Sequence, residues 1–413
     1  MTAPGTLQVH EMEVLAKPGQ RIPELDGIRG VAIALVLVWH YLTVPLFRSP
    51  SPVLHFIGCA TIQAWSGVDL FFVLSGFLIG GILIDAKGSE HYFRTFYIRR
   101  AFRILPIYTV ACLAYFPVAR LTAYAFHAAG MKAAMPWYIY ATFTQNFWLA
   151  NGRWYVWLSP TWSLAIEEQF YLTLPLLIWM LPARNLRKTL IAGVAAIFVF
   201  RYAMFLHYPK WSPAAFYVLA PFRADGLLMG VLAAIAVRDP VQLAAVRARR
   251  QWLILAGAVP AGFLAFATWE GWGAMSPWMS TVGYSVLGAF YVVLLLLTVT
   301  SSGALKRIFS WSALRWLGTI AYGLYLVHVL ALDFLDHLFR YRESTIARIM
   351  PIAIALAVSL LVAHLSWMLF ESRLVRYGHR FAYGSNWEIQ KQSRATSLDL
   401  RAGAESARAS PTK

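Results

Sequence analysis

The stretch DGIRGVAIALVLVWHY, residues 26–41, joins a cation to an unbroken apolar run that ends in an imidazole. A run of this kind predicts a helix inside a membrane. On an ideal helix, Arg29 and His40 point in directions about 20° apart and lie roughly 16 Å apart along the axis. One helix face would carry an anion-binding group near one membrane surface and a titratable base deep in the bilayer. We expect the rest of the chain to complete a site around this face.

The composition is that of a membrane protein. Of 413 residues, 59% are hydrophobic and 13% are charged, and many apolar runs reach about 20 residues, the length needed to cross a bilayer. The net charge of +17 comes from cations in short loops between apolar runs, a pattern typical of membrane topology and not of nucleic-acid binding. Cys59 and Cys112 are too few for a disulfide framework, and without metal-ligand spacing we expect no metal.

Apolar length and loop charge predict an all-α, polytopic membrane bundle of about ten transmembrane helices. The predicted spans are 28–47, 62–84, 104–120, 161–181, 189–207, 215–237, 251–269, 278–300, 316–338 and 347–370. The apolar segment 137–150 is short for a span, and we interpret it as a dip or surface helix. The expected inner loops are then richer in Lys and Arg than the outer ones, so both termini are predicted to be cytoplasmic.

Three regions follow from this topology. Residues 1–25 are predicted to be a cytoplasmic N-terminal segment and 26–372 the membrane domain. The polar stretch 384–413 lacks apolar periodicity, which predicts a disordered cytoplasmic tail. Since no separate apolar segment precedes the first span, we expect no cleaved signal peptide.

His40 is the first candidate for chemistry. An ionisable side chain at that depth is a functional hypothesis by default, and the alternative is an interfacial histidine in an aromatic belt. Asp69 lies at similar depth, so we expect it to orient His40 and stabilise its imidazolium. The alternative for Asp69 is an ion pair with Arg201 or Arg223.

The inner loop FYIRRAFRILP supplies three cations where the next span begins, Arg99, Arg100 and Arg103. Arginine recognises phosphate through two parallel hydrogen bonds, so this run and Arg29 together predict an anion-binding funnel. The alternative is that the run only satisfies the positive-inside rule.

The stretch SPTWSLAIEEQFYL carries Glu167 and Glu168 near the outer end of a predicted span. Adjacent residues of a helix diverge by about 100°, so at most one of these carboxylates should face a central cavity. We predict an acceptor-side or acid/base role for Glu167, with Glu168 as a further substrate contact or a structural group. Asn146 in FTQNFW is expected to place its amide near the same pocket.

Three further polar residues lie within predicted spans. Arg223 and Asp225 in PFRADGLLMG either bind substrate or form structural ion pairs, with each other or with other helices. His328 in AYGLYLVH is either a second titratable site or a packed histidine.

Taken in order, six pieces resemble the acyltransferase-3 family of integral membrane acyltransferases. They are PELDGIRGVAIALVLVWHY, GVDLFFVLSGFLIGGIL, FYIRRAFRILPIY, LSPTWSLAIEEQFYL, PFRADGLLMG and AYGLYLVH, within residues 23–371. The resemblance implies acyl transfer from cytoplasmic acyl-CoA, with acetyl-CoA expected, to a hydroxyl of a carbohydrate, glycolipid or small-molecule acceptor. It implies that His40, Arg29, the Arg99–Arg103 run and Glu167 are site residues.

The chain departs from the family pattern in three places. The run reads RRAFR instead of R-x-R, which leaves open which two arginines bind the donor. The end of the last span reads FESRLVRYG, without the proline that often follows the glutamate. No fused hydrolase-like domain accompanies these pieces, so we expect a stand-alone form.

The resulting prediction is an O-acyltransferase of the bacterial cytoplasmic (inner) membrane with His40 as general base. An acyl-His40 intermediate is the alternative chemical route. The competing class is a proton-coupled small-molecule transporter, against which the chain shows no repeated halves.

Overall fold

The computed structural model describes residues 22–128, 135–152, 158–208, 212–300, 303–339 and 345–384. Throughout these residues the secondary structure is helical, with no β-strand, which confirms the predicted all-α membrane bundle. The predicted N-terminal segment up to residue 21 and the tail from 385 onward lie outside the described residues.

Eight helical stretches of the described chain are long and apolar enough to cross a bilayer. They are Pro23–Phe47, Pro52–Ala86, Ala183–His207, Pro213–Arg238, Arg250–Trp269, Met279–Thr300, Ser312–Leu335 and Met350–Gly378. The remaining two predicted spans correspond to α6 (Tyr92–Ala128) and α9 (Trp162–Met180), which pack within the bundle. These are the two helices that carry the arginine run and the glutamate pair.

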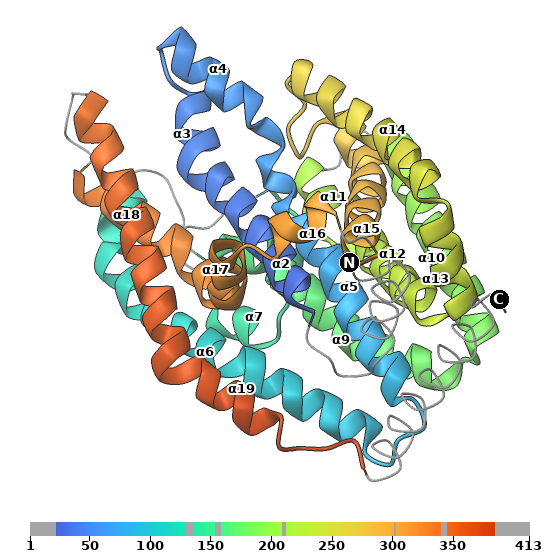
Figure 1. The fold of residues 1–413 in the computed structure, drawn as a ribbon. Helices are drawn as coiled ribbons and strands as arrows, with labels where there is room; N and C mark the ends of the chain where they lie inside the picture. Colours follow the sequence, from blue (N-terminus) through green and yellow to red (C-terminus); the bar gives the residue numbers. More distant parts are fainter. Residues whose placement is uncertain are drawn as a thin grey trace, which may run out of the picture.

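Most of the bundle consists of long helices. They are α2 (Pro23–Leu37), α5 (Gly67–Ala86), α6, α9, α10 (Ala183–His207), α12 (Ala220–Arg238), α14 (Arg250–Trp269), α15 (Tyr284–Thr300), α17 (Ser312–Phe339) and α18 (Thr345–Ser366). Figure 1 shows α2 and α5 in the middle of the bundle, with α6, α17, α18 and α19 on one side and α10, α12, α14 and α15 on the other.

Short helices join these elements. They are α3 (Val44–Phe47), α4 (Pro52–Ala60), α7 (Trp137–Ala141), α8 (Gln145–Leu149), α11 (Pro213–Val218), α13 (Pro240–Ala248), α16 (Ala304–Phe309) and α19 (Ser372–Gly378). Two 3₁₀ turns, η2 (Ile62–Ser66) and η3 (Ser159–Thr161), and three π-helical segments, η1 (Val38–Thr43), η4 (Met279–Gly283) and η5 (Trp367–Glu371), complete the described elements. The segment 137–150 contains only α7 and α8, five residues each, so it does not form a spanning helix, as predicted.

Glycines bring α2 against α16 and α17. A Cβ at Gly27 would lie 1.7 Å from the carbonyl oxygen of Phe309, and one at Gly30 would lie 1.9 Å from that of Leu314. On the facing helix, a Cβ at Gly318 would lie 1.8 Å from the Asp26 carbonyl oxygen. Helix backbones approach this closely only where side chains are missing. The glycines therefore fix α17 beside the helix that carries Arg29 and His40.

Glycines also bring α5 and α12 together. A Cβ at Gly76 would lie 1.9 Å from the carbonyl oxygen of Leu227. At the end of this helix pair, the Arg238 guanidinium donates two hydrogen bonds of 2.9 Å to the two carboxylate oxygens of Asp85. This bidentate pair and the close contact hold α5 and α12 in parallel register.

Candidate active site

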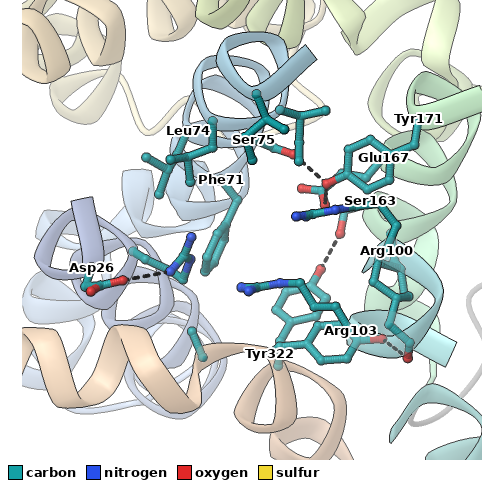
Figure 2. Close-up of a pocket in the computed structure, with 18 of the residues that line it drawn as sticks. Asp26, Phe71, Leu74, Ser75, Arg100, Arg103, Ser163, Glu167, Tyr171 and Tyr322 are labelled. Atoms are coloured by element: carbon teal, nitrogen blue, oxygen red, sulfur yellow. Dashed lines mark hydrogen bonds and ion pairs between the residues drawn. The ribbon is translucent and has the colours of Figure 1, made fainter. Parts of the chain in front are cut away.

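A cavity of about 390 Å³ lies between α2, α5, α6, α9 and α17. Three arginines line it, Arg29, Arg100 and Arg103. In Figure 2 the side chains of Arg100 and Arg103 reach into this space from one side, opposite Asp26. The cavity is therefore a candidate binding site for an anionic ligand within the bundle.

Arg29 has an acidic neighbour on its own helix. Its Nη1 donates to Oδ1 of Asp26, 3.1 Å away and one helical turn earlier. The pair fixes the direction of Arg29 and leaves the guanidinium on the wall of the cavity.

The arginine run divides into two parts. Arg100 and Arg103 line the cavity, and within the described chain no hydrogen bond or ion pair joins either guanidinium to a carboxylate. Arg99 turns away and donates to the backbone carbonyls of Phe381 (2.9 Å) and His379 (3.4 Å). Unpaired cations held in a bundle are costly unless a ligand or water compensates them. The geometry thus favours Arg100 and Arg103 as the anion-binding members of the run.

Of the glutamate pair, only Glu167 lines the cavity. The Tyr171 hydroxyl donates to its Oε2 at 2.9 Å, and Ser75 lies 2.6 Å from the same hydroxyl (Figure 2). Glu168 points away from the cavity, and its Oε1 is buried without a hydrogen-bond partner among the described residues. The two carboxylates diverge as expected of neighbours on a helix.

His40 is not among the residues that line the cavity, although Arg29 is, so the shared cavity wall expected for these two residues is not seen. His40 lies in the π-helical segment η1, whose i→i+5 hydrogen bonds differ from those of the ideal α-helix assumed for the sequence. The His40 Nδ1 lies 2.9 Å from the Val36 carbonyl oxygen. Since a carbonyl only accepts, Nδ1 carries the proton and Nε2 keeps its lone pair.

Asp69 does not orient His40. Its Oδ1 accepts a 2.9 Å hydrogen bond from Nη2 of Arg223, and both side chains are buried. This cross-helix ion pair was the alternative left open by the sequence. The group that fixes the His40 tautomer is the carbonyl of Val36.

Arg223 and Asp225 also pair with other helices and not with each other. The Arg223 guanidinium lies 3.8 Å from the centroid of the Tyr284 ring. Asp225 accepts from Arg201 at 3.1 Å and from the Ser285 hydroxyl at 2.6 Å. Since neither Arg223 nor Asp225 lines the cavity, these contacts indicate a structural role.

Asn146 is likewise turned away from the cavity. Its amide exchanges two hydrogen bonds with Gln169, of 3.3 and 3.1 Å, and so joins α8 to α9. The arrangement does not support the expected pocket contact.

His328 is fully buried and lies one helical turn beyond Tyr325, which lines the cavity. Its Nδ1 lies 2.7 Å from the Tyr325 carbonyl oxygen, and its Nε2 is buried without a hydrogen-bond partner in the described chain. As for His40, the carbonyl contact places the proton on Nδ1.

Sequence reasoning missed several residues of the cavity wall, Ser75, Ser163, Tyr171, Tyr322, Tyr325 and His379. Tyr171 and Tyr325 lie in motifs that were singled out for their charged neighbours. His379 follows the last span and had no such signal. Burial and the nearby cations Arg99, Arg100 and Arg103 lower the pKa of its imidazole.

Comparison with known families identifies the bundle. The model of the acyltransferase-3 family, described as an acyltransferase domain, matches residues 22–370. The chain belongs to this family. The family match contains every residue of the cavity wall except His379. The membership confirms the resemblance seen in the six ordered sequence pieces, and the apolar helices identify an integral membrane acyltransferase.

Several curated proteins are similar to this acyltransferase. Peptidoglycan O-acetyltransferase OatA of Listeria monocytogenes is 26% identical over 379 residues, which cover 86% of this chain and 56% of the relative. The putative peptidoglycan O-acetyltransferase YrhL of Bacillus subtilis is 28% identical over 330 residues, 74% of this chain and 48% of the relative. O-acetyltransferase OatA of Staphylococcus aureus is 25% identical over 384 residues, 88% of this chain and 58% of the relative.

The acyltransferase spans about half the length of these curated relatives. No solved structure gives a significant match. Within the described residues no group of three His, Cys, Asp or Glu side chains is placed to hold a metal ion.

Proposed function

We propose that this membrane acyltransferase moves an acyl group, with acetyl as the expected group, from cytoplasmic acyl-CoA to a hydroxyl of a carbohydrate acceptor. The observation that carries the proposal is that the guanidiniums of Arg100 and Arg103 line the cavity beside Arg29, with no hydrogen bond or ion pair to a carboxylate among the described residues. Guanidiniums suit phosphate oxygens. Coenzyme A carries phosphates at one end and the thioester at the other.

The remaining cavity wall suits the arm of such a donor. Leu74, Leu78, Ile79 and Ile82 of α5 line it with apolar side chains. Beyond Tyr325 on α17 lies His328, whose ring packs against that of His40 with centroids 4.8 Å apart. A donor held by its phosphates at the arginines and extended past Tyr325 brings its thioester toward these imidazoles.

In the proposed step, Nε2 of His40 takes the proton from the acceptor hydroxyl while the hydroxyl oxygen bonds to the thioester carbonyl carbon. The C–S bond breaks, and the departing thiolate of coenzyme A receives the proton from the imidazolium. The Val36 carbonyl keeps His40 in the tautomer that this step requires. The alternative route forms acyl-His40 first and then transfers the acyl group to the acceptor, with ping-pong kinetics.

Glu167 belongs to the donor side in this proposal. It lies on the same cavity as Arg100 and Arg103, where its carboxylate balances part of their charge and accepts the Tyr171 hydrogen bond. The names of the relatives from Listeria and Bacillus support a cell-wall carbohydrate as acceptor. A position in the bacterial inner membrane, with the arginines toward the cytoplasm, gives access to acyl-CoA.

The test uses purified protein in lipid nanodiscs, radiolabelled acetyl-CoA and peptidoglycan fragments as acceptor. We expect acceptor-dependent label transfer by the native protein and its loss in His40→Ala at equal expression. Label on the protein without acceptor would select the acyl-His40 route. If no acceptor is labelled and the protein does not bind acetyl-CoA, the proposal is wrong and the transporter class is favoured.

A further inference from the structure

The short segment after the last helix, residues 379–383, forms part of the cavity region. We call this segment the C-terminal strap. Three hydrogen bonds tie its backbone to α6 and to the residue before it. Arg99 Nε donates to the Phe381 carbonyl at 2.9 Å, and the Thr95 hydroxyl donates to the Ala382 carbonyl at 2.8 Å. The N–H of His91, which directly precedes α6, donates to the Tyr383 carbonyl at 3.1 Å. A loop held by this many bonds has one defined position relative to α6.

Ring contacts reinforce the attachment. The rings of Phe102 and Phe381 stack with centroids 6.2 Å apart. The Arg99 guanidinium lies 5.0 Å from the centroid of the Tyr383 ring, and Tyr383 is buried. Arg99 thus contacts the strap, while its neighbour Arg100 and Arg103, one turn further, line the cavity.

The strap places one side chain on the cavity wall. His379 lines the cavity together with Arg29, Arg100 and Arg103, yet it remains exposed, so it lies where the cavity opens. Its neighbour Arg380 instead lines a separate pocket, with His91 and Arg94. An imidazole beside three guanidiniums offers an additional N–H donor at the entrance to an anion site.

We propose that His379 is a donor-binding residue, which the strap holds in place to bind the phosphate groups of the acyl-CoA donor at the cavity mouth. This inference rests on the proposed acyl-CoA donor. It adds a binding residue that lies outside the matched family region, which ends at residue 370. The chemistry it recognises is a phosphate monoester or diphosphate attached to a long flexible arm.

The experiment measures equilibrium binding of radiolabelled coenzyme A to the full chain in nanodiscs. Loss of one hydrogen bond to a charged group weakens binding about tenfold, which is the expected effect of His379→Ala. Arg376→Ala is the matched control, because Arg376 is an exposed cation of α19 that lines neither pocket. We expect its affinity to stay within about twofold of the native value. His379→Asn keeps an N–H donor and should recover much of the loss.

A second measurement needs no variant. Diethylpyrocarbonate modifies exposed histidines, and peptide mass spectrometry reports modification of His379 and His91 with and without coenzyme A. We expect coenzyme A to protect His379, and His91, on the separate pocket, to react equally in both conditions.

The outcomes separate the two proposals. If the native protein binds coenzyme A but His379→Ala binds equally well and His379 is not protected, the strap proposal is wrong and the donor proposal stands. If the native protein binds no coenzyme A, both are wrong.

Discussion

The imidazoles of His40 and His328 meet edge to face, with ring centroids 4.8 Å apart and planes at 73°. The Tyr41 hydroxyl donates to the His328 carbonyl at 2.7 Å, which fastens the first span to α17 at the same level. Both rings carry the proton on Nδ1, but only His40 retains exposure, since His328 is 0% exposed. The accessible imidazole is therefore His40, and His328 supports its ring.

This relationship predicts unequal effects of two matched substitutions. His40→Phe should lower kcat about 10²–10⁴-fold, because it removes the proposed general base. His328→Phe keeps an aromatic ring at the contact and should lower kcat roughly tenfold, by shifting His40. Acetyl transfer by both variants at equal protein level is the measurement. Equal losses would contradict these unequal roles, and a larger loss in His328→Phe would favour His328 as the base.

The three arginines of the run are predicted to have different roles, which kinetic measurements can separate. Arg100→Ala or Arg103→Ala should raise the KM for acetyl-CoA about 10–100-fold, the effect of losing a charge-assisted hydrogen bond. Arg99→Ala should lower the melting temperature and affect the donor only through His379. The double variant Arg99→Ala with His379→Ala should therefore have the same KM for acetyl-CoA as the single variant His379→Ala. Additive losses would place Arg99 in direct contact with the donor.

The buried Asp69–Arg223 pair predicts rescue by a second substitution. Asp69→Ala leaves the Arg223 charge without its partner and should cost about 3–5 kcal/mol of stability. Replacing both residues, as in Asp69→Leu with Arg223→Met, should restore most of it. Thermal unfolding in detergent gives the comparison. A double variant that is stable but inactive would revive the idea that Asp69 acts on His40.

Close approach of α2 and α17 predicts sensitivity to one methyl group. Gly30→Ala would place Cβ 1.9 Å from the Leu314 carbonyl oxygen, and such overpacking costs about 1–3 kcal/mol or more. Gly262→Ala on α14 is the control, since no atom lies within 4 Å of its Cβ position. Melting temperatures should fall for the first variant and not for the second. An unchanged value for Gly30→Ala would show that α17 shifts freely.

Asp239 predicts a pH-dependent contribution to stability. It caps α13, and hydrogen bonds from the Gln242 side chain and from the backbone N–H groups of Val241 and Gln242 lower the pKa of its carboxyl. A depressed folded-state pKa stabilises the fold above the unfolded value, about 3.9, and this stabilisation disappears as pH falls through the folded value. Asp239→Ala should cost about 1 kcal/mol near pH 7.

The cost of Asp239→Ala should shrink on acidification below about pH 4. Asp239→Asn, which still caps a helix but does not titrate, should cost little at any pH. Melting temperatures of the three proteins across pH give the test, and a cost that stays constant into acid would contradict the assignment.

Apolar length and loop charge were sufficient to predict the bundle, because spanning helices are specified locally by hydrophobicity. That only one of Glu167 and Glu168 faces the cavity also followed from helix geometry. The partner of Asp69, Arg223, could not be predicted from helix geometry. Pairing across helices depends on their register, which is set by contacts such as that between the backbones of Gly76 and Leu227. The π-helical turn at His40 was equally invisible in the sequence.

The charged residues of α6 and α9 have a consequence for biogenesis. Charged side chains raise the free energy of membrane insertion; α6 carries Arg100 and Arg103 near its start, and α9 carries Glu167. Among the described residues, α9 is not one of the eight stretches that qualify for the bilayer by apolarity alone. Both α6 and α9 are synthesised after α2 and α5, whose side chains form part of the polar cavity. Insertion of α6 and α9 therefore depends on α2 and α5 being in the membrane first. A defect in α2 or α5 should appear first as failed insertion and degradation of the chain, before any loss of catalysis is measurable.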